Sequence, residues 1–316
     1  MYNFALIGAA GYIAPRHMQA IKETNNNLVA ILDKSDSVGI IDRYFPNAAL
    51  FLEAERFDRH VYRLSKKGNG EQVDYMSICS PNYLHDAHIR LALRNNANAI
   101  CEKPLVLNTW NLDGLAEMEK DTGKKIYHIL QVRLHPAVQK LKEKIENGPK
   151  DKIYDIDLTY ITGRGKWYYY SWKANMEKSG GITTNIGVHF FDMLTYIFGK
   201  VKENIVHYKS PSTAAGFLQL ERARVRWFLS LDADFVPTDI RAAGKTTYRS
   251  ILVDNEEVEF SEGFTDLHTV AYKKILAGEG FTLKDAYNYV DICQTIRNTD
   301  AIGILNDYHP FLQKLK

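Results

Sequence analysis

The stretch that decides the fold is Asn3-Phe4-Ala5-Leu6-Ile7-Gly8-Ala9-Ala10-Gly11-Tyr12-Ile13-Ala14, a short apolar run that ends in a glycine turn. The apolar run predicts a buried strand, and residues 14–24 predict the helix that follows it. Glycines at such a turn allow backbone N–H groups and the helix N-terminus to approach a pyrophosphate. The stretch therefore predicts the start of a dinucleotide-binding domain.

The spacing of this turn, Gly8-x-x-Gly11-x-x-Ala14, is one residue longer than Gly-x-Gly-x-x-Gly/Ala, and a glycine turn alone fits a purely structural role equally well. Asp33, at the end of the next predicted strand, strengthens the cofactor interpretation. A carboxylate there accepts both ribose hydroxyls of adenosine and repels a 2′-phosphate, which favours NAD over NADP, although Lys34 weakens this preference. The expected cofactor contacts in this region are Gly8, Gly11, Tyr12, Ile13, Asp33 and Lys34.

Short apolar runs and amphipathic segments alternate through the first third of the chain, which predicts a doubly wound parallel sheet covered by helices. The expected strands are 3–7, 28–32, 73–78, 99–101 and 126–130, and the expected helices are 14–24, 84–94, 112–121 and 136–146. Longer alternating runs at 153–162, 215–220 and 225–232, with helices at 184–196, 266–276 and 283–299, predict a largely antiparallel sheet. The fold class is α/β, with a dinucleotide-binding domain at 1–130 and an α+β substrate domain at 131–316.

The composition limits the class of protein. Forty Lys and Arg residues against 38 Asp and Glu residues leave a formal charge of +2, which argues against nucleic-acid and membrane-surface partners. Cys79, Cys101 and Cys293 are scattered and form no Cys-x-x-Cys pair, and no apolar run approaches the ~18 residues that span a bilayer. We therefore expect a cytoplasmic, soluble protein. No metal is expected either, because the pair His85 and His88 lacks a third ligand nearby.

Two polar segments follow predicted strands of the parallel sheet. They are Ser80-Pro81-Asn82 with His85, and Glu102-Lys103-Pro104. Open α/β sheets bind their ligands at the carboxyl ends of such strands. A desolvated Lys103 near a nicotinamide would hold an alcohol oxygen and favour its developing alkoxide, whereas the plainer interpretation is a surface lysine in a turn.

A second candidate group lies in Ser179-Gly180-Gly181-Ile182-Thr183-Thr184-Asn185-Ile186-Gly187-Val188-His189-Phe190-Phe191-Asp192. If this segment is helical from about Thr184, then Asn185, His189 and Asp192 share one face. A histidine facing a cleft can take a hydroxyl proton while hydride leaves the same carbon. A lone histidine on an apolar face more often serves packing, but its polar neighbours here favour a site.

Cations and aromatic residues crowd the segment Gly163-Arg164-Gly165-Lys166-Trp167-Tyr168-Tyr169-Tyr170-Ser171-Trp172-Lys173. Arginine suits bidentate contact with a carboxylate or diphosphate, and flat rings suit a pyranose or a base. The alternative is a sheet edge with cross-strand aromatic pairs.

Together these segments resemble the glucose-fructose oxidoreductase and inositol dehydrogenase (Gfo/Idh/MocA) family. The resemblance rests on the glycine turn with His17, Asp33, Ser80-Pro81-Asn82 with His85, Glu102-Lys103-Pro104, and Gly180-Gly181 followed by Asn185-x-Gly187-x-His189-x-x-Asp192. The family implies a Rossmann domain, a second domain with an open-faced sheet, and NAD(P)-dependent chemistry on sugars and cyclitols. It also implies a homo-oligomer, a dimer or a tetramer, formed through that sheet.

Carried onto this chain, the resemblance implies that Lys103 binds the reacting hydroxyl and that His189 is the acid/base. Asn185 stands where many relatives have aspartate, so His189 and Lys103 are left to share the proton transfer. The further cofactor contacts that the resemblance implies are Ser80, Pro81, Asn82, His85, Glu102, Lys103 and Gln131.

The longer glycine turn, Asn185, Gln131-x-Arg133-x-His135-Pro136 and the Arg164 to Trp172 cluster resemble one branch of that family. This branch oxidises C3 of UDP-N-acetylglucosaminuronic acid (UDP-GlcNAcA) ahead of an aminotransferase, in the synthesis of bacterial surface polysaccharide such as the O-antigen of lipopolysaccharide. It implies 2-oxoglutarate as a candidate re-oxidant of NADH. The substrate contacts that it implies are Lys103, Arg164, Tyr168, Ser171, Asn185, His189 and, more weakly, Arg241.

Two other functions remain open from the sequence. The same fold can act on a free sugar, inositol or a different nucleotide sugar, because arginine beside aromatic rings fits any anionic glycoside. It can also serve a non-enzymatic regulator that responds to NAD or to a sugar, since fold does not fix function. A regulator could dispense with Lys103 and His189, so their presence favours catalysis.

Overall fold

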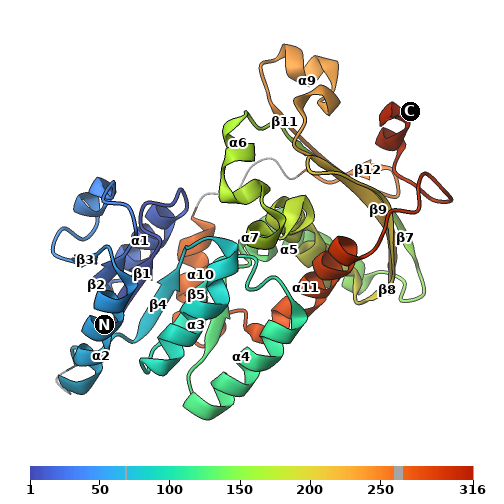
Figure 1. Cartoon of the computed structure of the whole chain (residues 1–316). Helices are drawn as coiled ribbons and strands as arrows, with labels where there is room; N and C mark the ends of the chain where they lie inside the picture. The colour runs from blue at the N-terminus through green and yellow to red at the C-terminus, as the bar shows by residue number, and fades with distance from the viewer. Residues whose placement is uncertain (68–69, 260–265, 316) are drawn as a thin grey trace. The chain divides into compact units, whose positions relative to one another are not determined.

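The computed structural model describes residues 1–67, 70–259 and 266–315 and divides into two compact units. The first unit comprises Met1–Leu134 with Thr265–Tyr287, and the second comprises His135–Phe264 with Asn288–Lys316. The chain thus leaves the first unit after Leu134, returns to it for a short segment near its end, and finishes in the second unit (Figure 1).

The first unit contains a six-stranded parallel sheet with the strand order β3-β2-β1-β4-β5-β6. Its strands are β1 (Asn3–Ile7), β2 (Asn27–Leu32), β3 (Ala49–Phe51), β4 (Tyr75–Ile78), β5 (Asn98–Cys101) and β6 (Ile126–His128). The order reverses at β1, so the carboxyl ends of β1 and β4 form the crevice where such sheets bind ligands. The expected doubly wound sheet is confirmed.

Helices cover both faces of this sheet. They are α1 (Ala14–Glu23), α2 (Ala54–Lys67), α3 (His85–Arg94), α4 (Thr109–Thr122) and α10 (Leu267–Leu276), with short 3-10 turns η1 (Gly39–Arg43), η2 (Asn82–Leu84) and η3 (Gln131–Leu134). Helices α1 and α10 lie against one face, and α2, α3 and α4 lie against the other (Figure 1). On α1 the buried residues recur at helical spacing and include Ala14, Met18 and Ile21, which explains why this segment is a helix on the sheet.

Helix α10 corrects one expectation about the placement of elements. Residues 266–276 were expected among the helices of the second domain, but α10 packs beside α1 in the first unit. Its Tyr272 and Ile275 lie in the same apolar core as Phe4 and Ile100 of the sheet. The physical reason is this shared core, which joins residues far apart in the sequence.

The second unit contains a six-stranded sheet with the order β12-β11-β7-β10-β9-β8. Its strands are β7 (Tyr154–Thr162), β8 (Val201–Lys209), β9 (Thr213–Leu220), β10 (Ala223–Ser230), β11 (Thr247–Val253) and β12 (Glu256–Glu257). Neighbouring strands are antiparallel except for β7 and β10, which run parallel. The expected largely antiparallel sheet is therefore confirmed.

The remaining helical elements belong mostly to the second unit. They are α5 (Pro136–Asn147), α6 (Trp167–Tyr170), η4 (Trp172–Ala174), α7 (Met176–Ser179), the π-helical turn η5 (Thr183–Gly187), α8 (Val188–Phe198), η6 (Ala233–Phe235), α9 (Thr238–Ala242), α11 (Leu283–Asn298), which begins in the first unit, and η7 (Pro310–Leu315). Phe191 of α8 packs edge-on against the buried Trp227 of β10. A second apolar cluster contains Phe228 of β10. In it, Val236 and Leu312 cover part of the sheet that was expected to be open-faced.

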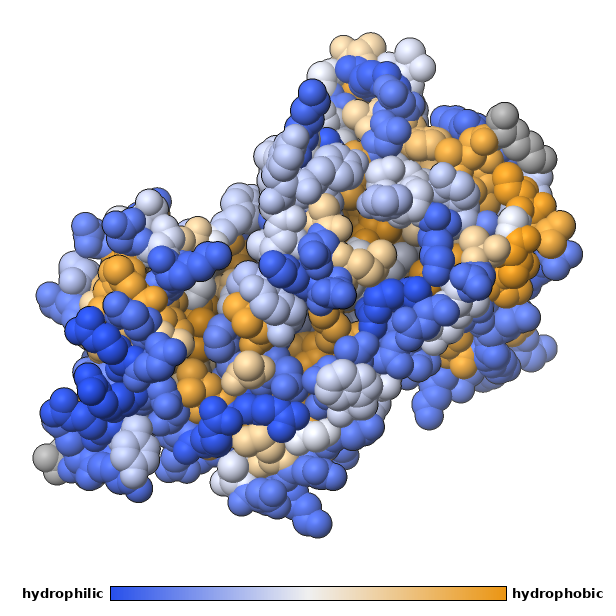
Figure 2. Space-filling model, viewed as in Figure 1, coloured by the Kyte–Doolittle hydropathy of each residue, from blue (hydrophilic) through white to orange (hydrophobic). Residues whose placement is uncertain are grey.

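No helix in the described ranges is long and apolar enough to cross a membrane. Figure 2 shows one face of the molecule, on which hydrophilic side chains predominate and hydrophobic ones form separate patches rather than a continuous belt.

Candidate active site

The glycine turn is built as a tight connection between β1 and α1. Gly8 has φ +92°, in the left-handed region, and its N–H donates to the carbonyl oxygen of Leu32 at 2.8 Å. A Cβ at Gly8 would lie 2.7 Å from the carbonyl carbon of Cys79. Only glycine fits here, because both the backbone angle and the neighbouring strand end exclude a side chain.

The turn leaves backbone donors at the start of α1. Among the described residues, the N–H groups of Tyr12 and Ile13 make no backbone or side-chain hydrogen bond. The carboxylate of Asp33, by contrast, is oriented by two backbone N–H groups. One oxygen of Asp33 accepts from the N–H of Ala10 at 2.7 Å, and the other accepts from Ser35 at 2.9 Å. The structure therefore brings the helix N-terminus and the expected ribose-binding carboxylate together at one edge of the sheet.

These features fit a dinucleotide. The free N–H groups suit a pyrophosphate, and the Asp33 carboxylate suits a ribose. The side chain of Gln131 in η3 adds a buried oxygen that has no partner among the described residues, which is an acceptor ready for a ligand amide or hydroxyl. Gly8, Asp33 and Gln131 were each expected to contact the cofactor.

The segment after β4 is held by two histidines. The Oγ of Ser80 lies 2.8 Å from Nδ1 of His88, and burial lowers the pKa of His88 to about 4. Both ring nitrogens of His85 contact carbonyl oxygens, Nδ1 at 2.7 Å from Pro104 and Nε2 at 2.8 Å from Ser80. His85 therefore links the two strand ends that were expected to border the cofactor.

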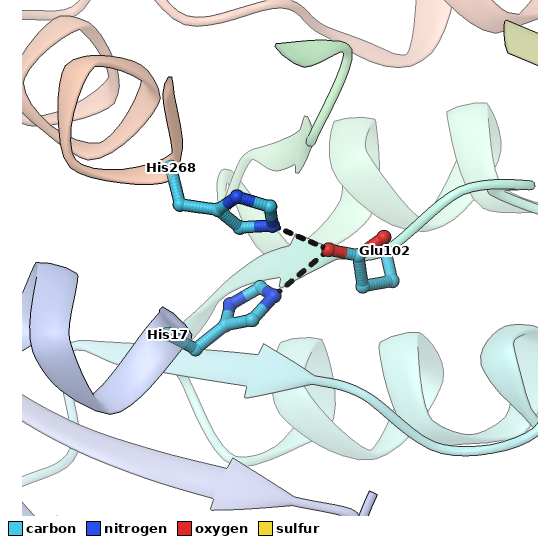
Figure 3. A group of neighbouring side chains, drawn as sticks. All are labelled: His17, Glu102 and His268. Atoms are coloured by element: carbon cyan, nitrogen blue, oxygen red, sulfur yellow. Dashed lines mark hydrogen bonds and ion pairs between the residues drawn. The ribbon is translucent and has the colours of Figure 1, made fainter. Parts of the chain in front are cut away.

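Lys103 lies half-buried directly after β5 and is followed by a cis peptide bond to Pro104. Its backbone N–H donates to Oε2 of Glu102 at 3.2 Å. The carboxylate of Glu102 is itself buried, and its Oε1 accepts hydrogen bonds from Nε2 of His17 at 3.0 Å and from Nε2 of His268 at 2.9 Å (Figure 3). The Glu102 carboxylate thus serves interactions within the protein.

In the second unit, Tyr168 and Asn185 form a hydrogen-bonded pair. The Nδ2 group of Asn185 donates to the hydroxyl oxygen of Tyr168 at 2.8 Å. Burial raises the pKa of Tyr168, so its hydroxyl stays protonated at neutral pH. Ser171 lies nearby, and its hydroxyl donates to the Tyr168 carbonyl oxygen at 2.7 Å. Three of the expected substrate contacts therefore lie together.

The same segment carries two cationic side chains, Arg164 and Lys173. Lys173 lies over the rings of Trp167 and Trp172, at 5.3 and 5.8 Å from the ring centroids. Burial and the neighbouring charge of Arg164 lower the pKa of Lys173. In the part of the chain that the structure describes, neither cation forms an ion pair with a carboxylate. Two like charges held close together without an acidic partner are suited to an anionic ligand.

His189 lies on the first turn of α8, but the segment before it differs from the expected regular helix. Residues Thr183–Gly187 form a π-helical turn, which changes the angle between Asn185 and His189 from that of an α-helix. Gly187 allows this turn to lie close to the sheet, since a Cβ there would be 2.7 Å from Cδ1 of Leu229. The shared face of Asn185, His189 and Asp192 stays a prediction.

Arg241 of α9 has hydrogen-bond partners in the preceding 3-10 turn η6. Its guanidinium donates to a carboxylate oxygen of Asp234 at 3.2 Å and to the Asp234 carbonyl oxygen at 2.8 Å. A role of Arg241 in binding substrate stays a prediction.

His268, Tyr272 and Ser77 complete the hydrogen bonds around Glu102 but were not predicted from the sequence, and Lys173 was not singled out. His268 and Tyr272 are four residues apart on α10 and both buried, so their helical spacing was visible. Nothing in the sequence, however, connected α10 with Glu102. Lys173 was visible only as one member of a basic and aromatic cluster.

Comparison with known proteins identifies both parts of the chain. Residues 2–129 match the model of an oxidoreductase family with an NAD-binding Rossmann fold, and residues 142–233 match the C-terminal α/β domain of the same family, Gfo/Idh/MocA. Among curated proteins, D-glucoside 3-dehydrogenase from Escherichia coli is 26% identical over 199 residues, which are 62% of this chain and 53% of that protein. Myo-inositol 2-dehydrogenase from Thermotoga maritima is 29% identical over 133 residues, 42% of this chain and 38% of that protein. The matched part of this chain thus spans about half or less of these relatives' lengths.

Solved structures extend the likeness to the whole chain. The WlbA (WbpB) dehydrogenase from Thermus thermophilus, in complex with NAD and UDP-GlcNAcA, is 51% identical with a TM-score of 0.94, covering 98% of this chain and 100% of that chain. The same dehydrogenase in complex with NAD and α-ketoglutarate gives a TM-score of 0.95. WlbA from Bordetella pertussis, at 18% identity and a TM-score of 0.76, shares the fold. The chain therefore belongs to the Gfo/Idh/MocA oxidoreductase family, and its first unit is that family's NAD-binding Rossmann domain.

Proposed function

We propose that the protein is an NAD-dependent dehydrogenase that oxidises the 3-hydroxyl of UDP-GlcNAcA to a ketone. The observation that carries the proposal is the 51% identity over nearly the whole chain to a dehydrogenase whose structure contains NAD and UDP-GlcNAcA. The glycine turn, Asp33 and Gln131 of the first unit support NAD as the cofactor.

The cation pair of the second unit supports an anionic sugar as the substrate. Arg164 and Lys173 would face the carboxylate or the diphosphate of UDP-GlcNAcA, and the indoles beside Lys173 offer flat surfaces for a ring. A neutral free sugar or inositol would leave the two positive charges without a counter-charge.

In this proposal Lys103 holds the 3-hydroxyl oxygen and His189 takes its proton. Bound NAD supplies the acceptor for the hydride that leaves C3. Lys103 stabilises the negative charge that develops on the oxygen as the proton departs, and the Tyr168–Asn185 pair orients the sugar. Fixing the carbinol between an amine and an imidazole supplies much of the rate.

We also propose 2-oxoglutarate as a second substrate, reduced at its ketone to a 2-hydroxy acid as it regenerates NAD. A complex of the related Thermus enzyme with NAD and α-ketoglutarate supports this role. The keto sugar would then pass to an aminotransferase reaction in the cytoplasmic synthesis of a surface polysaccharide such as O-antigen. We further propose a homo-oligomer, a dimer or a tetramer, which light scattering of the purified protein tests.

The test is turnover of purified protein with NAD and UDP-GlcNAcA, with and without 2-oxoglutarate. NADH is followed at 340 nm, and the keto sugar and the 2-hydroxy acid are followed by mass spectrometry. We expect both products in equal amounts when 2-oxoglutarate is present. Tight NAD binding without turnover of any sugar would contradict the proposal and favour a regulator.

A pair of lysine variants tests the anionic substrate. Lys173→Met should raise KM for UDP-GlcNAcA about tenfold or more, as loss of a charged contact does. Lys166→Met, which removes an exposed lysine of the same loop, should leave KM within about twofold. Equal effects of the two substitutions would contradict the assignment of Lys173.

A further inference from the structure

A buried set of polar side chains in the first unit has no part in the reaction described above. Glu102, His17 and His268 come from the end of β5, from α1 and from α10, and Figure 3 shows both imidazoles pointing at one oxygen of the carboxylate. All three side chains are almost completely buried. A buried carboxylate costs stability unless it is hydrogen-bonded, so this cluster requires an explanation.

The direction of each hydrogen bond follows from the atoms involved. Oε1 of an ionised Glu102 can only accept, so Nε2 of both His17 and His268 must donate to it. Nδ1 of a neutral His17 is then an acceptor, and the hydroxyl of Tyr272 donates to it at 2.7 Å. Ser77 in turn donates to the Tyr272 oxygen at 2.6 Å. The bonds form one chain, in which every donor points toward Glu102.

The charge states agree with this chain. Burial alone would raise the pKa of Glu102, but hydrogen bonds from His17 and His268 outweigh burial and hold that pKa well below its ordinary value. Burial lowers the pKa of His17 despite the nearby carboxylate, so its imidazole stays neutral. At neutral pH Glu102 is therefore ionised and His17 is neutral, which are the states that the hydrogen-bonded chain requires.

A metal ion is the obvious alternative occupant. The three ligand atoms lie within 4.8 Å of one another, and two histidines with one carboxylate are a familiar metal-ligand set. In this structure, however, both Nε2 atoms are within hydrogen-bond distance of the same oxygen, and Tyr272 fixes the tautomer of His17 that carries its proton there. The geometry favours protons between these atoms.

The second oxygen of Glu102 connects the cluster with Lys103. Oε2 accepts the backbone N–H of Lys103 at 3.2 Å, and the carbonyl oxygen of Pro104 lies 2.7 Å from Nδ1 of His85. The Lys103–Pro104 dipeptide is thus held at both ends. Any rotation of the Glu102 carboxylate would release one of these ends.

We propose that the chain Ser77–Tyr272–His17–Glu102–His268 is a positioning device for Lys103. It locks the Glu102 carboxylate so that its outer oxygen fixes the backbone from which the Lys103 side chain extends. The inference rests on the proposed function, in which the Lys103 amine holds the reacting hydroxyl. His17, His268 and Glu102 are positioning residues, which act through the Lys103 peptide without touching substrate.

Two variants of His268 test the proposal. His268→Leu removes the donor to Glu102, whereas the amide nitrogen of His268→Gln can replace Nε2. We expect kcat to fall about tenfold or more in His268→Leu, because losing a partner that orients a catalytic group has an effect of about that size. KM for the sugar and Kd for NAD should stay within about threefold of the wild-type values. His268→Gln should recover most of kcat. Equal kcat in both variants and the wild type would overturn the proposal.

Hydrogen exchange gives a readout that does not depend on activity. The Lys103 amide should exchange at least about tenfold faster in His268→Leu than in the wild type, and His268→Gln should restore slow exchange, because the bond to Glu102 protects that amide. Unchanged exchange would overturn the proposal even in an active enzyme. If the wild type fails to turn over UDP-GlcNAcA while exchange behaves as expected, the proposed function fails and the positioning of the peptide stands.

Two further measurements cover the remaining outcomes. If His268→Leu does not fold, Tyr272→Phe, which removes one hydroxyl, should still lower kcat several-fold with KM unchanged, and an unaltered kcat would count against the proposal.

Elemental analysis of the purified wild-type protein should find no stoichiometric zinc, iron or manganese, and EDTA should leave kcat unchanged. One bound metal per chain whose removal abolishes activity would replace the hydrogen-bonded chain by a metal centre.

Discussion

The backbone around Lys103 is anchored on both sides, and this bears on the role that we propose for its side chain. Its peptide is held by Glu102 and, through Pro104, by His85. The sequence identified Lys103 from its place before a proline at a strand end. His268, which holds Glu102 in place, could not be identified in the same way, because it is distant in the sequence and reaches Glu102 only through tertiary packing.

Replacing Lys103 by Ala should lower kcat about 100-fold or more, because in the proposed reaction its amine makes a contact that strengthens as negative charge develops on the substrate oxygen. NAD binding, measured by fluorescence quenching, should stay within about threefold of the wild type. A fully active Lys103→Ala variant would remove Lys103 from the mechanism.

We expect the Asp33 carboxylate to favour NAD over NADP, because it can accept ribose hydroxyls and repels a 2′-phosphate. Its carboxylate is oriented by the N–H groups of Ala10 and Ser35. Asp33→Asn removes the negative charge, so the ratio of kcat/KM for NAD to that for NADP should fall about tenfold or more. Lys34→Met is the matched control, and we expect it to change the ratio in the opposite direction. A ratio that Asp33→Asn leaves unchanged would assign cofactor choice to other residues.

At the scale of elements, the structure departs most from the sequence analysis where apolar periodicity is weak or short. Strand β3 has three residues, and the edge strand β8 buries only Val206 and His207, so neither shows clear alternation. Helix α2 was also missed, although Phe57, Val61 and Leu64 recur at helical spacing. The central strands were found because both faces of each are covered, which makes their apolar runs continuous.

The π-helical turn before α8 could not be predicted from composition, since its five residues have no special sequence pattern. Its close approach to the sheet depends on Gly187. Gly187→Ala would place a Cβ 2.7 Å from Leu229 and 2.9 Å from Phe191. We expect a loss of about 1–3 kcal/mol in the free energy of unfolding, as for other overpacked cores, measured by urea denaturation.

Gly39→Ala is the control for this prediction, because a Cβ at Gly39 has no heavy atom within 4 Å. Its urea midpoint should match that of the wild type within error. If Gly187→Ala has the same midpoint as Gly39→Ala, the core around α8 yields more easily than the contacts indicate.

At the scale of the whole molecule, buried neutral histidines predict how stability depends on pH. Burial lowers the pKa of His128 in the first unit to about 3 and that of His309 in the second to about 4. The unfolded chain binds protons at these sites below about pH 6.5, whereas the folded protein does not. The contribution of these histidines to the free energy of unfolding is therefore complete above pH 6.5. It falls as the pH drops toward 4, by about 1.4 kcal/mol per pH unit for each such histidine.

The variant His309→Asn tests this dependence, because its amide oxygen can still accept the N–H of Phe311, as Nδ1 of His309 does at 3.1 Å. The slope of unfolding free energy against pH between pH 4.5 and 6 should become smaller by about 1.4 kcal/mol per pH unit. A slope equal to that of the wild type would mean that His309 is protonated in the folded state.

The three thiols are all buried and unpaired, and burial raises the pKa of each, that of Cys293 to about 12. They should therefore resist alkylation in the native protein and react only when their surroundings open. Cys79 and Cys101 belong to the first unit and Cys293 to the second. Pulsed labelling in rising urea, with peptides identified by mass spectrometry, should report the opening of each half separately, so the wild-type chain carries its own local stability probes.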